Sequence, residues 1–179
     1  MGAGGWVKRG ELRQWGGDAL DVVSVGYSSP FGHHREAEVA ATGASEVACV
    51  VVDHHDRIVL ALAFGLGTAS RGWSLPTTWA GDGEDQLTAA ERAIREMCGW
   101  SVHSPRPMWQ LMRWPDRTDL VTTIVTARAR KAQWQTHPDV EDVDWFTRQE
   151  VRGLLRAGHA FDAVTAAVLF WWLDSGSNQ

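Results

Sequence analysis

The sequence predicts an α/β domain in which a mixed sheet lies between helices, preceded by an extension of antiparallel strands. Three observations lead to this prediction: several segments are rich in β-branched residues, one central segment has the pattern of a helix, and two helical segments follow near the end. This order of elements is typical of a sheet covered by helices. We expect residues 1–43 to form the extension and residues 44–179 the main domain.

Strands are predicted first in the extension and then at the start of the main domain. In the extension they cover Asp18–Tyr27 and Glu36–Thr42, around the loop Ser28–Gly32. In the main domain, Glu46–Asp53 and Arg57–Phe64 flank a polar tetrad. We expect a hairpin here, because Asp53-His54-His55-Asp56 has the composition of a turn. The two histidines are explained more simply as turn residues than as metal ligands.

A helix is predicted over Gln86–Cys98, with Gly99 as its C-terminal stop. The segments expected after it are paired strands over Met108–Trp114 and Asp119–Ala127 around the turn Pro115–Arg117, a polar loop over Lys131–Asp142, and a short strand over Val143–Phe146. Thr147–Glu150 resembles a capping box that opens a helix to about Leu155, and Phe161–Asp174 has the composition of an apolar helix.

Composition excludes several classes of protein. The formal net charge of −5 gives no basic face for DNA or RNA. No segment reaches the roughly 18 consecutive apolar residues of a membrane span, and the first residues lack the apolar core of a secretory signal. Two cysteines make neither a disulfide framework nor a zinc site. We therefore expect a cytoplasmic protein with no nucleic-acid or membrane partner.

The segment Leu75–Trp100, LPTTWAGDGEDQLTAAERAIREMCGW, carries the most information about chemistry. It resembles the Nudix box, G-x5-E-x7-R-E-U-x-E-E-x-G-U, where U is an aliphatic residue, and it aligns with this pattern without gaps. The residues that match are Glu84, Arg92, Ile94, Glu96 and Gly99. The residues that depart from it are Thr78 at the first glycine, Ala93 and Met97 at two of the glutamates, and Trp100 at the last aliphatic position.

The resemblance extends over nearly the whole chain. The N-terminal strands, Trp73–Pro76 and the tail Trp145–Thr165 are similar to ADP-ribose pyrophosphatase-like members of the Nudix superfamily. This resemblance implies a Nudix-type α/β/α sandwich with a mixed central sheet, a small-molecule substrate, and a homodimer formed through the N-terminal extension.

The resemblance also implies a metal site, but this sequence lacks most of its carboxylate ligands. Positions 93, 96 and 97 share one helix face, and in the family three carboxylates there hold Mg²⁺ or Mn²⁺, which neutralises a diphosphate and activates water. Here only Glu96 is acidic, so we expect metal binding to be weakened or lost. Glu84 and Arg92 correspond to the structural ion pair of the box. Thr78 adds a β-branched residue where the family has glycine, which predicts an altered loop.

Other residues are candidates for the same site. In the resembled subgroup a late loop supplies a catalytic glutamate, which points to Glu141 as a catalytic partner of Glu96, with Asp139 and Asp142 nearby. Solvated loop charges are the alternative explanation of this stretch. The chain contains 11 tryptophans, and Trp73 and Trp79 are predicted, with Arg92, to bind substrate by stacking or covering it. Core packing is the alternative for each tryptophan, and for Trp100 the preferred one.

Three functions remain open on the sequence. The first is a divergent hydrolase of a nucleoside-diphosphate-linked compound of the ADP-ribose or dinucleotide type, with an altered, metal-poor site. The second is a Nudix scaffold repurposed for non-hydrolytic acid–base chemistry in a specialised biosynthetic pathway. The third is a catalytically inactive nucleotide-binding module. An enzyme, whether hydrolase or repurposed catalyst, is favoured over an inactive binder, because polar groups remain where the site is expected. The hydrolase is the first of these expectations.

Overall fold

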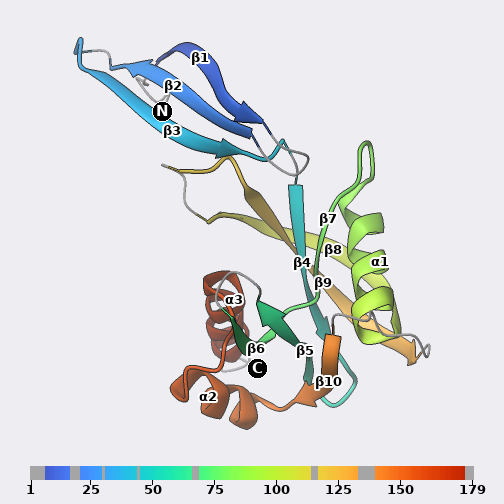
Figure 1. The fold of residues 1–179 in the computed structure, drawn as a ribbon. Coiled ribbons are helices and arrows are strands. Elements are labelled where there is room, and N and C mark those ends of the chain that lie inside the picture. Colours follow the sequence, from blue (N-terminus) through green and yellow to red (C-terminus); the bar gives the residue numbers. More distant parts are fainter. Residues whose placement is uncertain are drawn as a thin grey trace. The chain divides into compact units, whose positions relative to one another are not determined.

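The computed structural model describes residues 7–16, 21–29, 31–43, 45–65, 69–113, 117–132 and 140–175. The chain divides into two compact units, Met1–Ala44 with Met112–Val121, and Ser45–Leu111 with Thr122–Gln179. The elements, labelled in Figure 1, are β1 (Val7–Gly16), β2 (Asp21–Ser28), β3 (His34–Ala41), β4 (Ser45–Val52), β5 (Ile58–Gly65), β6 (Ser70–Ser74), β7 (Thr77–Trp79), α1 (Gln86–Cys98), β8 (Trp100–Met112), β9 (Val121–Ala132), β10 (Val140–Phe146), α2 (Arg148–Arg156) and α3 (Ala163–Ser175).

The larger unit is built on a seven-stranded sheet. Its main path runs β10-β5-β4-β9-β8, while β6 pairs with β5 and β7 pairs with β4. The predicted hairpin is confirmed, since Val52 pairs with Ile58 and the Asp53 carboxylate accepts hydrogen bonds from the backbone N–H of His55 and Arg57. The two histidines therefore lie in a turn, and both are exposed.

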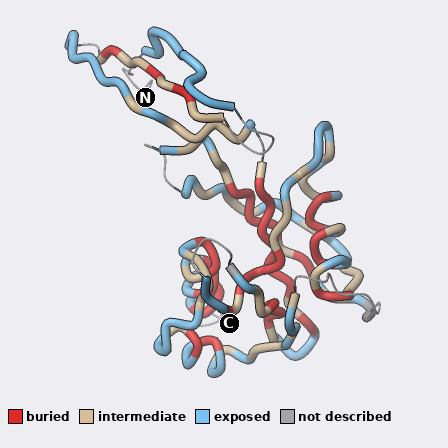
Figure 2. Tube along the Cα trace, viewed as in Figure 1, coloured by how far each residue is buried: buried red, intermediate tan, exposed pale blue. Residues whose placement is uncertain are grey.

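Alternating residues of β4 divide the core into two layers. Val47, Cys49 and Val51 pack in one cluster with the buried face of α1, whereas Ala48 and Val50 pack in the other with α2 and α3. Successive side chains of a strand point to opposite faces of a sheet, so each cluster belongs to one face. Figure 1 shows α1 on one side of the sheet and α2 and α3 on the other, and Figure 2 shows the buried positions concentrated along these inner surfaces. The predicted α/β/α sandwich is confirmed.

The smaller unit contains an antiparallel sheet in the order β1-β2-β3. Residues 112–121, expected to belong to the main domain, group instead with the N-terminal strands. The cause is local hydrogen bonding: Asp119 accepts from the backbone N–H and the hydroxyl of Thr42, and Ala40 forms a parallel bridge with Thr118. Burial acts to raise the pKa of Asp119, but the hydrogen bonds from the backbone and hydroxyl of Thr42 help to lower it overall.

Several element boundaries differ from the sequence-based expectation. The strand β1 was not predicted, because all ten of its residues are exposed and show no apolar alternation. The loop expected over Lys131–Asp142 was wrong at both ends, since β9 continues to Ala132 and β10 begins at Val140. Strand β7 lies where an altered loop was predicted at Thr78. The turn predicted at Pro115–Arg117 falls mostly outside the described residues.

Among the residues that the structure describes, no helix is long and apolar enough to cross a membrane.

Candidate functional site

Helix α1 positions the residues of the box, and its two ends are fixed as the sequence predicted. The Asp85 side chain accepts hydrogen bonds from the backbone N–H of Leu87 and Thr88 at the N-terminus. Gly99 ends the helix with a left-handed backbone, at φ 67°, which glycine adopts without steric cost. Because both ends are capped, the register of the side chains between them is well defined.

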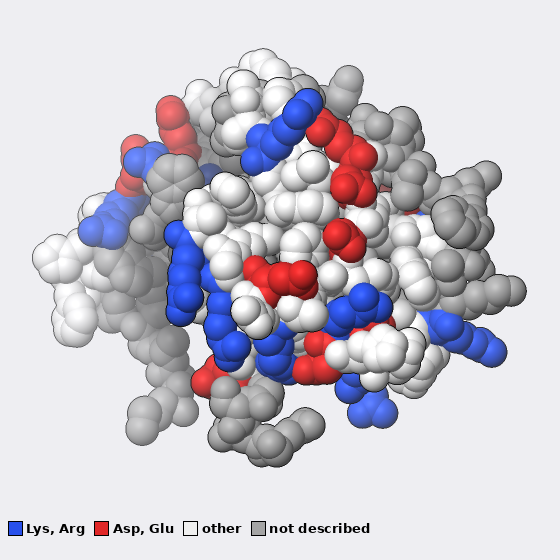
Figure 3. All heavy atoms as spheres, turned by 90° about the horizontal axis from the view of Figure 1, so that it is seen from below, with Lys and Arg blue, Asp and Glu red and all other residues white. Residues whose placement is uncertain are grey.

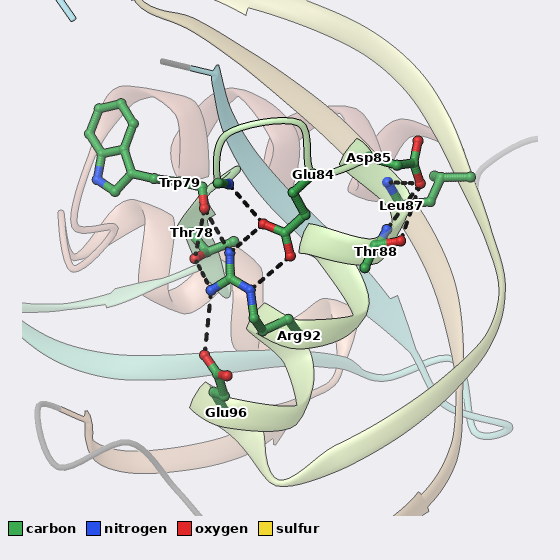
Figure 4. Close-up of polar contacts among 9 residues, drawn as sticks. Thr78, Trp79, Glu84, Asp85, Leu87, Thr88, Arg92 and Glu96 are labelled. Carbon is green, nitrogen blue, oxygen red and sulfur yellow. Dashed lines mark hydrogen bonds and ion pairs between the residues drawn. The ribbon is translucent and has the colours of Figure 1, made fainter. Parts of the chain in front are cut away.

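The guanidinium of Arg92 is the centre of the site (Figure 4). Its Nε and Nη2 donate to the two carboxylate oxygens of Glu84, at 3.0 and 2.8 Å. Nη2 also donates to the backbone carbonyl of Trp79 at 2.8 Å, and Nη1 donates to the Thr78 hydroxyl at 3.1 Å. Nη1 lies 3.6 Å from a carboxylate oxygen of Glu96, one helical turn away. We call Thr78, Trp79, Glu84, Arg92 and Glu96 the Arg92 cluster.

These contacts shift the pKa of both members of the bidentate pair. Hydrogen bonds from Arg92, and then from the Gly81 backbone N–H, lower the pKa of Glu84 from 4.5 to about 2. The pKa of Arg92 is raised, chiefly by its hydrogen bond with Glu84. The geometry is that of a charge-assisted, two-pronged pair, which is stronger than a neutral hydrogen bond. It joins the loop before α1 to the helix itself.

The structure accounts for the threonine at the glycine position of the pattern. Thr78 lies in β7, opposite Val47 of β4. An extended strand suits a β-branched residue, so the backbone here does not require glycine. The hydroxyl of Thr78 adds an acceptor for Arg92, a contact that glycine could not make. The altered loop expected at this position is therefore a short strand joined to the Arg92 cluster.

The two other carboxylate positions of the family are filled by apolar side chains. Ala93 is 1% exposed and lies in the core cluster beneath α1. The Met97 sulfur accepts a hydrogen bond from the backbone N–H of Thr77 at 3.2 Å. A magnesium or manganese ion prefers several oxygen ligands, and this helix face offers only the carboxylate of Glu96. The residues present on α1 therefore do not fit the family's metal centre.

Glu141 lies on β10, where its carboxylate pairs with Arg71 of β6 at 3.1 Å. Among the described residues, no group of three or more His, Cys, Asp or Glu side chains is placed to hold a metal ion. The described structure thus does not join Glu141 and Glu96 into such a group, and Asp139 lies outside the described residues. The catalytic role of Glu141 stays a prediction.

The tryptophans near the box have different environments. The indole of Trp73 packs edge-on against Phe146, with ring centroids 4.7 Å apart, and its backbone bonds with His159 and Phe161. Trp100 packs edge-on against Trp145 at 5.2 Å, in agreement with core packing. Trp79 is 48% exposed, and Figure 4 shows its indole pointing away from the Arg92 cluster. Of the two tryptophans predicted to bind substrate, Trp79 is the more accessible.

Cys98, at the end of α1, is buried. Burial raises the pKa of its thiol to about 12, which disfavours the reactive thiolate.

The sequence left one contact of the site unnoticed, the ion pair between Arg92 and Glu96. Its signal was present, because residues four apart on a helix face each other. The metal-binding pattern of the box instead predicts a cation from solution as the partner of Glu96.

Comparisons with known proteins agree with this fold. A family model of the NUDIX domain matches residues 43–168. No curated protein matches the chain. Among solved structures, the crystal structure of an ADP compounds hydrolase superposes with a TM-score of 0.80 and is 19% identical, covering 97% of each chain. That structural likeness establishes the fold, and the family match covers well over half of the sequence. The chain belongs to the Nudix family.

Proposed function

We propose that this protein is a divergent Nudix hydrolase that cleaves a small nucleoside-diphosphate-linked compound, of the ADP-ribose or dinucleotide type, in an altered and metal-poor site. The observation that carries the proposal is the Arg92 cluster, which keeps the box in place and presents Glu96 at its edge. The family match and the likeness to an ADP compounds hydrolase support the choice of substrate class.

Four residues have different roles in the proposed reaction. Glu96, with a side chain 45% exposed, is the carboxylate available for general acid–base work. Arg92 was predicted to bind substrate, but its N–H groups already face acceptors, so we assign it a positioning role. The exposed indole of Trp79 offers a surface on which a base can stack. Glu141 is proposed as a second carboxylate acting in catalysis.

Two alternative functions are compatible with the same fold. The apolar side chains of Ala93 and Met97 favour either a nucleotide-binding module without catalysis or a repurposed enzyme with non-hydrolytic chemistry. A small-molecule ligand is common to all three. The mixture of acidic and basic residues on the face drawn in Figure 3, with the net charge of −5, supports a partner other than nucleic acid.

Activity and binding measurements separate these functions. Purified protein with Mg²⁺ or Mn²⁺ is incubated with ADP-ribose and with dinucleoside polyphosphates, and release of nucleoside monophosphate is measured. We expect release that Glu96→Gln lowers by at least tenfold, corresponding to about 1.4 kcal/mol of transition-state stabilisation. Glu91→Gln, an exposed glutamate of α1, is the matched control. Calorimetric nucleotide binding without turnover would favour the binding module instead.

We also propose that the protein is a homodimer and that the N-terminal sheet forms its interface. Strand β1 exposes three large apolar side chains, Val7, Leu12 and Trp15. They pair with Ser28, Ser24 and Val22 of β2. These β2 residues are two or four positions apart and so share one face. The three apolar side chains therefore lie together on one exposed sheet surface, as a protein–protein contact requires.

A further inference from the structure

The guanidinium of Arg92 lies beside the carboxylate of Glu96, so a cation of the protein itself faces this carboxylate. Arg92 Nη1 lies 3.6 Å from Glu96 Oε2. A guanidinium has five N–H groups, and Arg92 makes five polar contacts: two to Glu84, one each to Trp79 and Thr78, and one to Glu96. The guanidinium is held from several sides, so its charge is fixed beside the Glu96 carboxylate.

The positions next to Glu96 on the same helix face are closed to hard cations. Ala93 is packed in the core, with 1% of its surface exposed. The thioether of Met97 is engaged by the backbone N–H of Thr77 at 3.2 Å. A thioether is a soft ligand and a methyl group is none, whereas magnesium and manganese select oxygen. A divalent ion would find one carboxylate there, and it would have to approach an existing positive charge.

From these contacts we propose that helix α1 holds no divalent cation of its own, and that Arg92 neutralises Glu96 in place of the family's metal. The proposal concerns the protein without substrate. It shares only its site with the proposed function. Metal binding is measured with no nucleotide present, so the result for this proposal does not depend on whether the protein hydrolyses a nucleotide.

Titration of the full chain with Mn²⁺ tests this proposal. Free Mn²⁺ is followed by electron paramagnetic resonance, and heat by calorimetry, for wild type, Glu96→Gln and the control Glu91→Gln. At Mn²⁺ concentrations up to about 1 mM, even weak oxygen sites in proteins are filled. In this range we expect no stoichiometric Mn²⁺ binding that depends on Glu96. One equivalent bound by wild type and by Glu91→Gln, but lost in Glu96→Gln, would overturn the proposal. Mn²⁺ binding that is equal in all three proteins does not involve Glu96 and agrees with the proposal.

A second experiment tests whether the missing carboxylate at position 97 is the reason that Mn²⁺ does not bind. Met97→Glu restores a carboxylate one residue from Glu96, and position 97 is only partly buried, so the variant is expected to fold. We expect it to bind Mn²⁺ at least tenfold more tightly than Met97→Gln, which has a similar size and no charge. Circular dichroism establishes that both are folded. A folded Met97→Glu with no advantage over Met97→Gln would contradict the assignment.

Discussion

Arg92 links three parts of the site through one planar group. Lysine keeps the charge but cannot make a two-pronged pair with Glu84 while also reaching Thr78 and the Trp79 carbonyl. We therefore expect Arg92→Lys to lower the free energy of unfolding by about 1–3 kcal/mol, the effect of losing one or two hydrogen bonds to charged groups. Urea denaturation measures this difference.

The control for this substitution lies one turn further along the same helix. Arg95 is exposed in the last turn of α1. Arg95→Lys keeps the favourable charge there and is expected to change stability by less than about 0.5 kcal/mol. Equal losses in the two variants would show that the contacts of Arg92 contribute nothing specific.

The lowered pKa of Glu84 predicts how stability depends on acid. Because the pKa falls from 4.5 to about 2 on folding, the ionised carboxylate stabilises the fold fully above about pH 4.5. This contribution is lost as the pH falls towards 2, where the folded protein also takes up the proton. Urea denaturation at stepped pH should therefore show a steeper loss of stability for wild type than for Glu84→Gln.

Glu91→Gln serves again as the comparison, since Glu91 is exposed on α1. Its stability should fall with pH as steeply as that of wild type. If Glu84→Gln gave the same slope as both, the acid dependence would have to come from other carboxylates.

At the scale of elements, strand β6 passes very close to the segment that precedes α3. A Cβ on Gly72 would lie 2.9 Å from the Phe161 Cα, a backbone atom that cannot move alone. Gly72→Ala should therefore destabilise the protein by about 1–3 kcal/mol through overpacking, measured by thermal or urea denaturation. Gly26→Ala, also in a strand but with no atom within 4 Å of the added Cβ, should lack this penalty. Similar losses in both variants would mean that the approach of Phe161 is not the cause.

Elements with a strong local signal could be predicted from the sequence. Helix α1 begins at Gln86 and ends at Cys98 as expected, because Gly99 is a residue that stops helices and the apolar positions follow the helical period. The capping box of Thr147 and Glu150 is present, and it lowers the pKa of Glu150 through the backbone N–H and then the hydroxyl of Thr147. In both cases neighbouring residues along the chain determine the structure.

Elements that depend on distant partners could not be predicted in the same way. Strand β1 contains charged residues and glycine, and its hydrogen bonds to β2 are what make it a strand. The start of β10 at Val140 depends on its pairing with Ala63 of β5. The same limit applies to the site: the pattern showed that Ala93 and Met97 are not acidic, but only the fold shows that one is in the core and the other bonds to Thr77.

At the scale of the whole molecule, the described fold is held by groups other than the metal-binding carboxylates of the family. The sandwich depends on two apolar layers and on the pair that joins Glu84 to Arg92. The carboxylates of a metal centre contribute little to such a core, and a buried charge at position 93 would oppose it. Ala93 lies in the apolar cluster beneath α1 and Met97 packs against it. A widely used fold can carry different chemistries on one scaffold.

Assembly of the molecule is expected to depend on the exposed apolar surface of β1. Leu12 and Trp15 are 64% and 57% exposed on the same face of β1. If this surface joins two copies, two charges placed on it would have to be buried unpaired, which is strongly unfavourable. We expect wild type to sediment as a dimer and Leu12→Glu/Trp15→Glu to sediment as a monomer in analytical ultracentrifugation. Phe170→Glu, which charges an aromatic residue 62% exposed on α3, should leave the dimer unchanged. A monomeric wild type would contradict the homodimer. A dimer that survives Leu12→Glu/Trp15→Glu but dissociates in Phe170→Glu would place the contact on α3 instead of β1.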